Sequence, residues 1–114
     1  MPQDLTANLE ALLAKGNDAP PLRFALATRY LAAGDAAAAV RHAQACVALD
    51  AEYSAGWKVL GQSLAAAGDR TEAAASYRRG IAVAEGRGDK QAAKEMQVFL
   101  RRLEKDAPGA NTPR

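Results

Sequence analysis

The chain contains the stretch LAAGD at residues 31–35 and a near copy, AAAGD, at residues 65–69. Each stretch ends an apolar run with Gly followed by Asp, so Gly34 stands 34 positions before Gly68. Similarity at a fixed spacing of this size is typical of proteins built from stacked structural repeats. The two stretches therefore predict two copies of one unit, at residues 20–53 and 54–87.

Alignment of the two units places small residues on small residues and large apolar residues on large apolar residues. Ala27 falls on Gly61, and Leu26 falls on Leu60. Two antiparallel helices joined by a tight turn approach closely only where both carry small side chains. Each unit is therefore expected to be a helical hairpin. The further matched pairs are Ala39 with Ala73, Cys46 with Gly80, and Val47 with Ile81.

Helix start and stop signals extend the pattern beyond the two units. Asp residues stand where helices should begin, and Gly residues stand where helices should end. The helix that opens the first unit is expected to be capped by Asn17 or Asp18. The other expected caps are Asp4, Asp35, Asp69 and Asp89.

Composition favours an all-α fold. Of the 114 residues, 49% are hydrophobic and only 5% are aromatic, and Ala, the best helix former, dominates the apolar share. No β-branched run alternates with polar residues as a strand requires. The expected organisation is a single domain at residues 1–106, with a leading helix at 4–14, the two repeats, a capping helix at 89–105, and a disordered tail at 107–114.

Charge and cysteine content exclude several classes of function. The net charge of +2 is too weak to indicate nucleic acid binding, and no stretch approaches the roughly 18 apolar residues of a membrane span. A single cysteine allows no intrachain disulfide, and the opening residues MPQDLTANLE are polar, unlike a secretory signal. We therefore expect a cytoplasmic protein without nucleic acid or membrane partners.

Residues with catalytic or ligand-binding chemistry are few and scattered. His42 is the only histidine, and its place in the sequence predicts an outward-facing side chain. Cys46 stands at a small-residue position and is expected to be a buried, inert thiol. The stretch GRGD at residues 86–89 follows a helix instead of a strand, so it predicts a turn and not a phosphate-binding loop. We predict no catalytic site, no metal site and no cofactor.

The residues that define the two units resemble the tetratricopeptide repeat, a helix–turn–helix unit of 34 residues. The second unit carries Leu64 where Tyr is usual, and its matching residues are Trp57, Leu60, Gly61, Ala73, Tyr77 and Gly80. The first unit matches through Leu26, Ala27, Tyr30, Ala39 and Cys46. The resemblance implies a right-handed α-α superhelix of about six antiparallel helices, with Trp57 and Tyr77 in its core.

The resemblance also implies a function. Proteins of this family hold an extended peptide or a partner helix in a concave groove lined by the first helix of each hairpin. Phe24 and Tyr53 are the apolar anchors that this implies here, and Lys58 is the implied contact for a carboxylate. Carried over by repeat position, the groove residues are Phe24, Thr28, Leu31, Ala32, Glu52, Tyr53, Lys58, Gln62, Ala65 and Ala66.

The sequence leaves two interpretations of the function open. In the first, the groove makes the chain a protein-interaction adaptor without catalytic activity. Phe24 and Leu31 either belong to this groove or simply help to bury the leading helix. In the alternative, the chain is a structural subunit or a self-associating homodimer scaffold that uses its terminal helices. Some family members grip a C-terminal carboxylate with a set of Lys and Asn residues. Phe24, Thr28 and Val59 stand at those places here, so no such clamp is expected.

Overall fold

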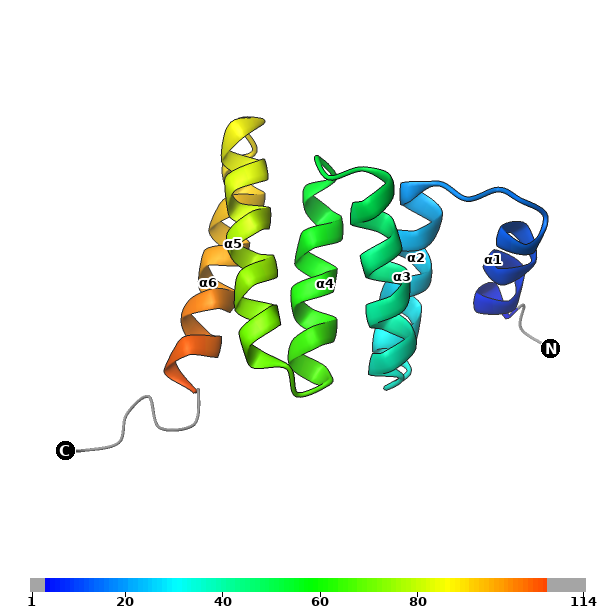
Figure 1. Cartoon of the computed structure of the whole chain (residues 1–114), viewed down its shortest axis with the longest axis horizontal. Coiled ribbons are helices and arrows are strands. Elements are labelled where there is room, and N and C mark those ends of the chain that lie inside the picture. The colour runs from blue at the N-terminus through cyan, green and yellow to red at the C-terminus, as the bar shows by residue number, and fades with distance from the viewer. Residues whose placement is uncertain (1–3, 107–114) are drawn as a thin grey trace.

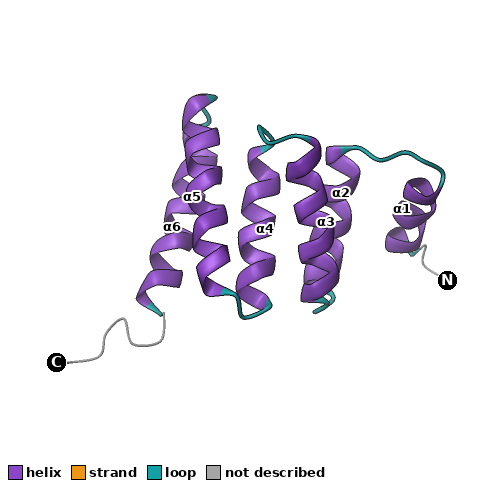
Figure 2. Ribbon diagram, viewed as in Figure 1, coloured by secondary structure: helices purple, strands orange, loops and turns teal. Residues whose placement is uncertain are grey.

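The structure is a computed structural model that describes residues 4–106 of the chain. These residues form six helices and no strand (Figure 1; Figure 2). The expected tail at 107–114 lies outside the described residues. The helices are α1 (Leu5–Ala14), α2 (Pro20–Ala32), α3 (Ala36–Leu49), α4 (Ser54–Ala66), α5 (Arg70–Gly86) and α6 (Lys90–Lys105). The all-α fold predicted from the sequence is confirmed.

The helices are arranged one after another in an elongated array (Figure 1). α2 packs on α3 and α4 packs on α5, which makes the two hairpins, and α6 packs on α5. α4 also contacts both α2 and α6, whereas α3 and α5 do not contact each other. We call the side formed by α2, α4 and α6 the inner face, and the side formed by α3 and α5 the outer face.

A Gly-Asp turn joins the two helices of each hairpin. Gly34 has a φ of 85° and Gly68 a φ of 89°, in the left-handed region that residues with side chains rarely adopt. After the first of these turns the Asp35 N–H donates to the Tyr30 carbonyl at 2.9 Å, while the Asp35 carboxylate accepts from the Ala38 N–H. The same two residues therefore end one helix and begin the next.

Aspartate caps stand at the start of four helices, as predicted. Each carboxylate accepts a hydrogen bond from the backbone N–H three residues further on, so it satisfies one of the free donors of the first turn. The capping residues are Asp4, Asp35, Asp69 and Asp89.

The predicted cap of α2 by Asn17 or Asp18 is wrong. α2 begins with two prolines, Pro20 and Pro21, and has no side-chain cap. Proline carries no N–H, so the first turn of α2 offers little for a carboxylate to accept. Asp18 instead accepts from the Arg23 guanidinium at 2.8 Å, which lowers the pKa of the Asp18 carboxyl.

Helix packing inside the second hairpin centres on Gly61. A side chain at this position would place its Cβ 2.5 Å from Cε1 of Tyr77, a residue that is only 3% exposed. In the first hairpin, Ala27 and Ala43 stand at the positions equivalent to Gly61 and Tyr77, and both are fully buried. The predicted close approach of the hairpin helices is present at Gly61, but there the small residue faces the large Tyr77 ring and not a second small side chain.

α6 packs against the second hairpin through large apolar side chains. Met96 is fully buried and lies against Gly80, and the Phe99 ring stacks on the Tyr77 ring with 5.8 Å between centroids. Trp57 is half-buried, and its indole Nε1 donates to the Ala51 carbonyl at 2.8 Å. Trp57 and Tyr77 are therefore packing residues, as predicted.

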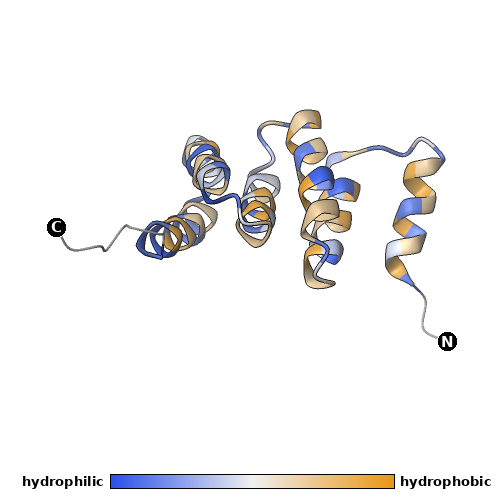
Figure 3. Ribbon diagram, turned by 60° about the horizontal axis from the view of Figure 1, so that its bottom comes forward, coloured by the Kyte–Doolittle hydropathy of each residue, from blue (hydrophilic) through white to orange (hydrophobic). Residues whose placement is uncertain are grey.

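The backbone of α1 lies close to that of α2 alone among the described helices, and none of the α1 residues is fully buried. Among its leucines only Leu9 and Leu13 are half-buried, while Leu5 and Leu12 are 46% and 43% exposed. Figure 3 shows hydrophobic segments along α1, which lies at one end of the array. Leu9 and Leu13 therefore lie on the covered side of α1, and Leu5 and Leu12 lie on its open side.

The glycine at position 61 provides the first testable prediction. Gly61→Ala should destabilise the fold by about 1–3 kcal/mol, because the buried Tyr77 ring has no room to move away from the new Cβ. Gly86→Ala is the matched control, since a Cβ at that α5 position meets no atom within 4 Å. Urea unfolding followed by circular dichroism measures both. Equal unfolding midpoints for the two variants would show that Gly61 is not a point of close approach.

Candidate functional site

The predicted groove residues lie mainly on two helices in contact, α2 and α4. Phe24, Leu31 and Ala65 are half-buried and pack against the core, so they form the floor of the inner face instead of projecting from it. Thr28 is exposed, and its hydroxyl donates to the Phe24 carbonyl at 2.9 Å. Gln62 is half-buried. Two further predicted residues, Ala32 and Ala66, are exposed at the ends of their helices.

The two predicted aromatic anchors meet where the α3–α4 connector passes α2. The Phe24 and Tyr53 rings lie 5.9 Å apart between centroids, tilted by 57°. Burial raises the pKa of the Tyr53 hydroxyl, so this group is neutral and able to donate a hydrogen bond at neutral pH. The pair forms an apolar corner between α2 and the start of α4.

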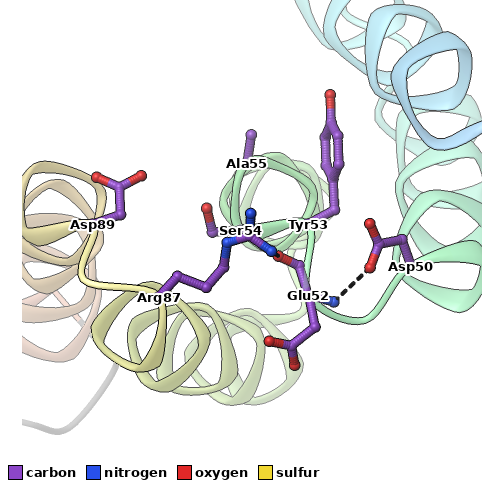
Figure 4. Close-up of a pocket in the computed structure, with 7 residues that line it drawn as sticks. All are labelled: Asp50, Glu52, Tyr53, Ser54, Ala55, Arg87 and Asp89. Atoms are coloured by element: carbon purple, nitrogen blue, oxygen red, sulfur yellow. Dashed lines mark hydrogen bonds between the residues drawn. The ribbon is translucent and has the colours of Figure 1, made fainter.

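A hollow of about 230 Å³ opens beside Tyr53, between the α3–α4 connector and the α5–α6 turn (Figure 4). Arg87 reaches across it and donates to the Glu52 carbonyl at 3.3 Å, while the Glu52 N–H donates to the Asp50 carboxylate at 2.9 Å. Glu52 therefore contributes its backbone to the junction of the two hairpins. Half-buried Ser54 and the side chain of Asp89 also line this hollow.

Lys58 is already paired within the fold, whereas the sequence predicts that it is available for a partner's carboxylate. Its Nζ lies 3.1 Å from Oε1 of Glu95 on α6, and this hydrogen bond lowers the pKa of the Glu95 carboxyl. The pair brings α6 onto the inner face beside α4. A hollow of about 350 Å³ lies there, lined by the pair together with Val98, Phe99 and Arg102.

The sequence-based prediction does not include the α6 side of the inner face, because groove residues are assigned by repeat position and only to the two repeats. Two signals in the sequence could have found it. The first signal is the strongly apolar side of α6, which must pack on α5 and leaves Val98 outside that packing. In the structure Val98 is 37% exposed. The helix also carries Glu95 one turn before Phe99, as a helix that faces both solvent and core requires.

The prediction that His42 faces outward is wrong. The His42 side chain is buried under α1, with 7% of its surface exposed. Its Nδ1 lies 3.0 Å from Arg23 Nη1, its Nε2 lies 3.5 Å from Glu10 Oε2, and the Tyr30 ring stacks on it at 5.4 Å. Because arginine only donates, Nδ1 accepts, so the neutral ring carries its proton on Nε2, toward Glu10.

This polar cluster joins α1 to the first hairpin. The Tyr30 hydroxyl donates to the Glu10 carboxylate at 2.5 Å, which raises the pKa of Tyr30. Burial lowers the pKa of His42, and the nearby Glu10 opposes that effect while Arg23 and Arg41 add to it. The sequence could not indicate this, because Glu10 and His42 are brought together only by the docking of α1.

Cys46 is a buried thiol, as predicted. It is fully buried, its Sγ donates to the Pro20 carbonyl at 3.4 Å, and burial raises its pKa to about 11. A thiol with this pKa is protonated at neutral pH and is a poor nucleophile. Within residues 4–106 no three acidic, histidine or cysteine side chains are grouped as a metal site requires.

None of the helices in the described part of the chain has the length and apolar character needed to cross a membrane.

Stacked helical hairpins with small residues at each close approach and Gly-Asp turns define an α-helical repeat protein. A curated relative, the TPR repeat-containing protein PA0015 of Pseudomonas aeruginosa, is 54% identical over 97 residues, which are 85% of this chain and 92% of that protein. The chain therefore belongs to the tetratricopeptide repeat family, as the sequence suggested.

A solved structure leads to the same fold. The solution structure of protein BPP2914 from Bordetella parapertussis is 44% identical and superposes with a TM-score of 0.79, over 92% of this chain and 91% of that one. No family model matches the chain.

The burial of His42 makes folding stability depend on pH. The folded pKa lies below the ordinary value of 6.5, so the unfolded chain binds the proton more readily. This contribution is complete well above pH 6.5 and is lost as the pH falls from that value through the lowered folded pKa. We expect the thermal midpoint to drop between about pH 7.5 and 5.5, a window above the range in which carboxylates titrate.

His42→Gln is the control for this prediction. Its amide keeps a neutral donor and acceptor between Glu10 and Arg23 but takes up no proton. The decrease in thermal midpoint across this window should therefore be smaller in the variant than in the parent protein. The same decrease in both proteins would mean that His42 does not cause it.

Proposed function

We propose that the protein is an interaction module that holds an extended peptide or a partner helix across its inner face. The observation that carries this proposal is that apolar anchors stand at both ends of that face. The Phe24–Tyr53 pair lies on the α2 side, and Val98 with Phe99 lies on the α6 side. Between them Lys58 and Glu95 form a polar strip that gives a partner direction and register.

The size of the face sets the strength of binding. Two repeats and α6 offer a short surface, so the buried area should stay below about 1,200 Å² in total, at the low end for specific interfaces. Affinity then depends on a few well-packed anchors instead of on area. Val98, which is 37% exposed, is the apolar side chain that a partner would cover most completely at the α6 end.

An adaptor without catalytic activity fits the chemistry of the described residues. Catalysis by His42 or Cys46 would require access and a suitable pKa, whereas both side chains are buried and hydrogen-bonded within the fold. Membership in a repeat family of interaction modules supports the same role. We expect this adaptor to act in the cytoplasm, where a single thiol stays reduced.

The exposed leucines of α1 favour self-association as the second candidate function. Leu5 and Leu12 lie on the side of α1 that no described helix covers, and each is more than two-fifths exposed. Two copies joined through these residues would form a homodimer. A mass that doubles with concentration in light scattering, and that stays monomeric in Leu12→Lys, would establish this role.

The inner face is tested by truncating one anchor at each of its two ends. Tyr53→Ala combined with Val98→Ala should weaken partner binding at least about tenfold, because truncation of an anchor residue costs more than about 1 kcal/mol. Leu49→Ala is the matched control, since Leu49 on α3 is 48% exposed and lies on the outer face. Partners captured from the producing cells are purified, and their affinities are measured by calorimetry. Loss of binding in Leu49→Ala but not in the double variant would move the binding site to the outer face.

A further inference from the structure

The outer face contains a hollow of about 320 Å³ over the middle of α4. It exists because α3 and α5 do not contact each other and leave α4 uncovered between them. Its floor is made by Trp57, Leu60 and Leu64, and its sides by Gln44 of α3 and Ser76 of α5. Leu60 and Leu64 are only 4% and 7% exposed, so the hollow narrows to an apolar base.

The first hairpin has an equivalent place, which α1 covers. A shift of 34 positions carries Gln44 to Glu10, so α1 stands beside α2 as α3 stands beside α4. The same shift carries Leu64 to Tyr30 and Ser76 to His42. The first hairpin therefore shows which of the protein's own side chains occupy the equivalent space.

In the first hairpin the space is closed by two rings. Tyr30 and His42 stack with an interplanar angle of 2° and 5.4 Å between centroids, and the Tyr30 hydroxyl donates to Glu10. In the second hairpin a leucine and a serine replace these rings, and an amide replaces the carboxylate. The hollow thus lies where the first hairpin has aromatic side chains, and the Gln44 side-chain carbonyl, an acceptor, stands at the position equivalent to Glu10.

The charged residues around the hollow determine which charged group can bind next to an aromatic ring placed in it. Asp69 and Glu72 line the end near Leu64. One oxygen of Asp69 is used as the α5 cap, and the Glu72 carboxylate has no hydrogen bond or ion pair with any residue between 4 and 106. At the opposite end of the hollow, the Arg79 guanidinium carbon lies 4.9 Å from the centroid of the Trp57 ring. That end of the hollow therefore already carries a positive charge. A cation of the occupant is therefore attracted to the acidic end only.

We propose that the hollow between α3 and α5 binds a tyrosine side chain of a partner protein that carries a lysine or arginine next to it. The ring lies on Leu60 and Leu64 as Tyr30 lies in the first hairpin, and its hydroxyl donates to Gln44. The neighbouring cation pairs with Glu72. This site is on the outer face and is separate from the inner face, so one partner can be held at both faces or two partners at once.

The test uses small probes in place of the partner. N-acetyl-Tyr-Lys-amide should bind in a saturable way and change the fluorescence of Trp57, the only tryptophan of the chain. Backbone amide signals in nuclear magnetic resonance should shift along α4 and the facing sides of α3 and α5. N-acetyl-Leu-Lys-amide and N-acetyl-Tyr-Glu-amide should each bind at least about tenfold more weakly, since one lacks the ring and the other lacks the cation.

Matched variants fill the hollow from within. Leu64→Tyr supplies the ring that the first hairpin has at Tyr30, and it should weaken the Tyr-Lys probe at least about tenfold while keeping the amide spectrum of the fold. Ala82→Tyr adds the same ring at an exposed α5 position outside the hollow, so it should leave binding unchanged. Glu72→Gln should remove most of the preference for Tyr-Lys over Tyr-Glu.

Three results would overturn the proposal: no saturable change with the Tyr-Lys probe, equal binding of all three probes, or full binding by a folded Leu64→Tyr variant. Ser76→His, the second ring of the first hairpin, replaces Leu64→Tyr if that variant does not fold. The comparison of the three probes on the parent protein needs no variant, so it tests the proposal in either case.

Discussion

The contact between Gly61 and the Tyr77 ring is the constraint on which the rest of the structure depends. It fixes the distance between α4 and α5, and with it the position of α4, the helix that touches α2, α3, α5 and α6. Once α4 is placed, Gly56 meets Cys46 of α3, and Gly80 of α5 receives Met96 of α6. Small residues thus allow close approach at these helix crossings, and large side chains from the neighbouring helices fill the space that the small residues leave. Both the inner face and the outer hollow depend on where α4 lies.

The two hairpins share a backbone plan but use it differently. Around α2 the space beneath α1 is filled with charged and aromatic groups that satisfy one another, Glu10, Tyr30, His42 and Arg23. Around α4 the space has an apolar floor and is left partly open. A buried polar network stabilises the fold only when all its members are paired. An open apolar hollow, in contrast, leaves apolar surface that another molecule can cover. The first hairpin thus uses this space to attach α1, and the second leaves it free.

The sequence is informative where a residue acts through its neighbours in the chain. The Gly-Asp turns, the aspartate caps, the spacing of small residues and the burial of Cys46 depend on local geometry repeated at a fixed interval, and the sequence predicts all of them. The surroundings of His42 and Lys58 come instead from helices remote in sequence, α1 for the first and α6 for the second. No local pattern could therefore indicate that either side chain is paired.

Two further failures of the sequence-based prediction have separate causes. The α2 cap fails for a local reason, since two prolines remove the donors that a cap needs. The α6 side of the inner face could not be found by repeat register, because α5 has 17 residues where α3 has 14, which moves α6 out of that register. By repeat position, α1 instead matches the second helix of a hairpin. No helix of the described residues stands in the first-helix place beside α1, so a helix added there by design would complete a third hairpin and start a longer array.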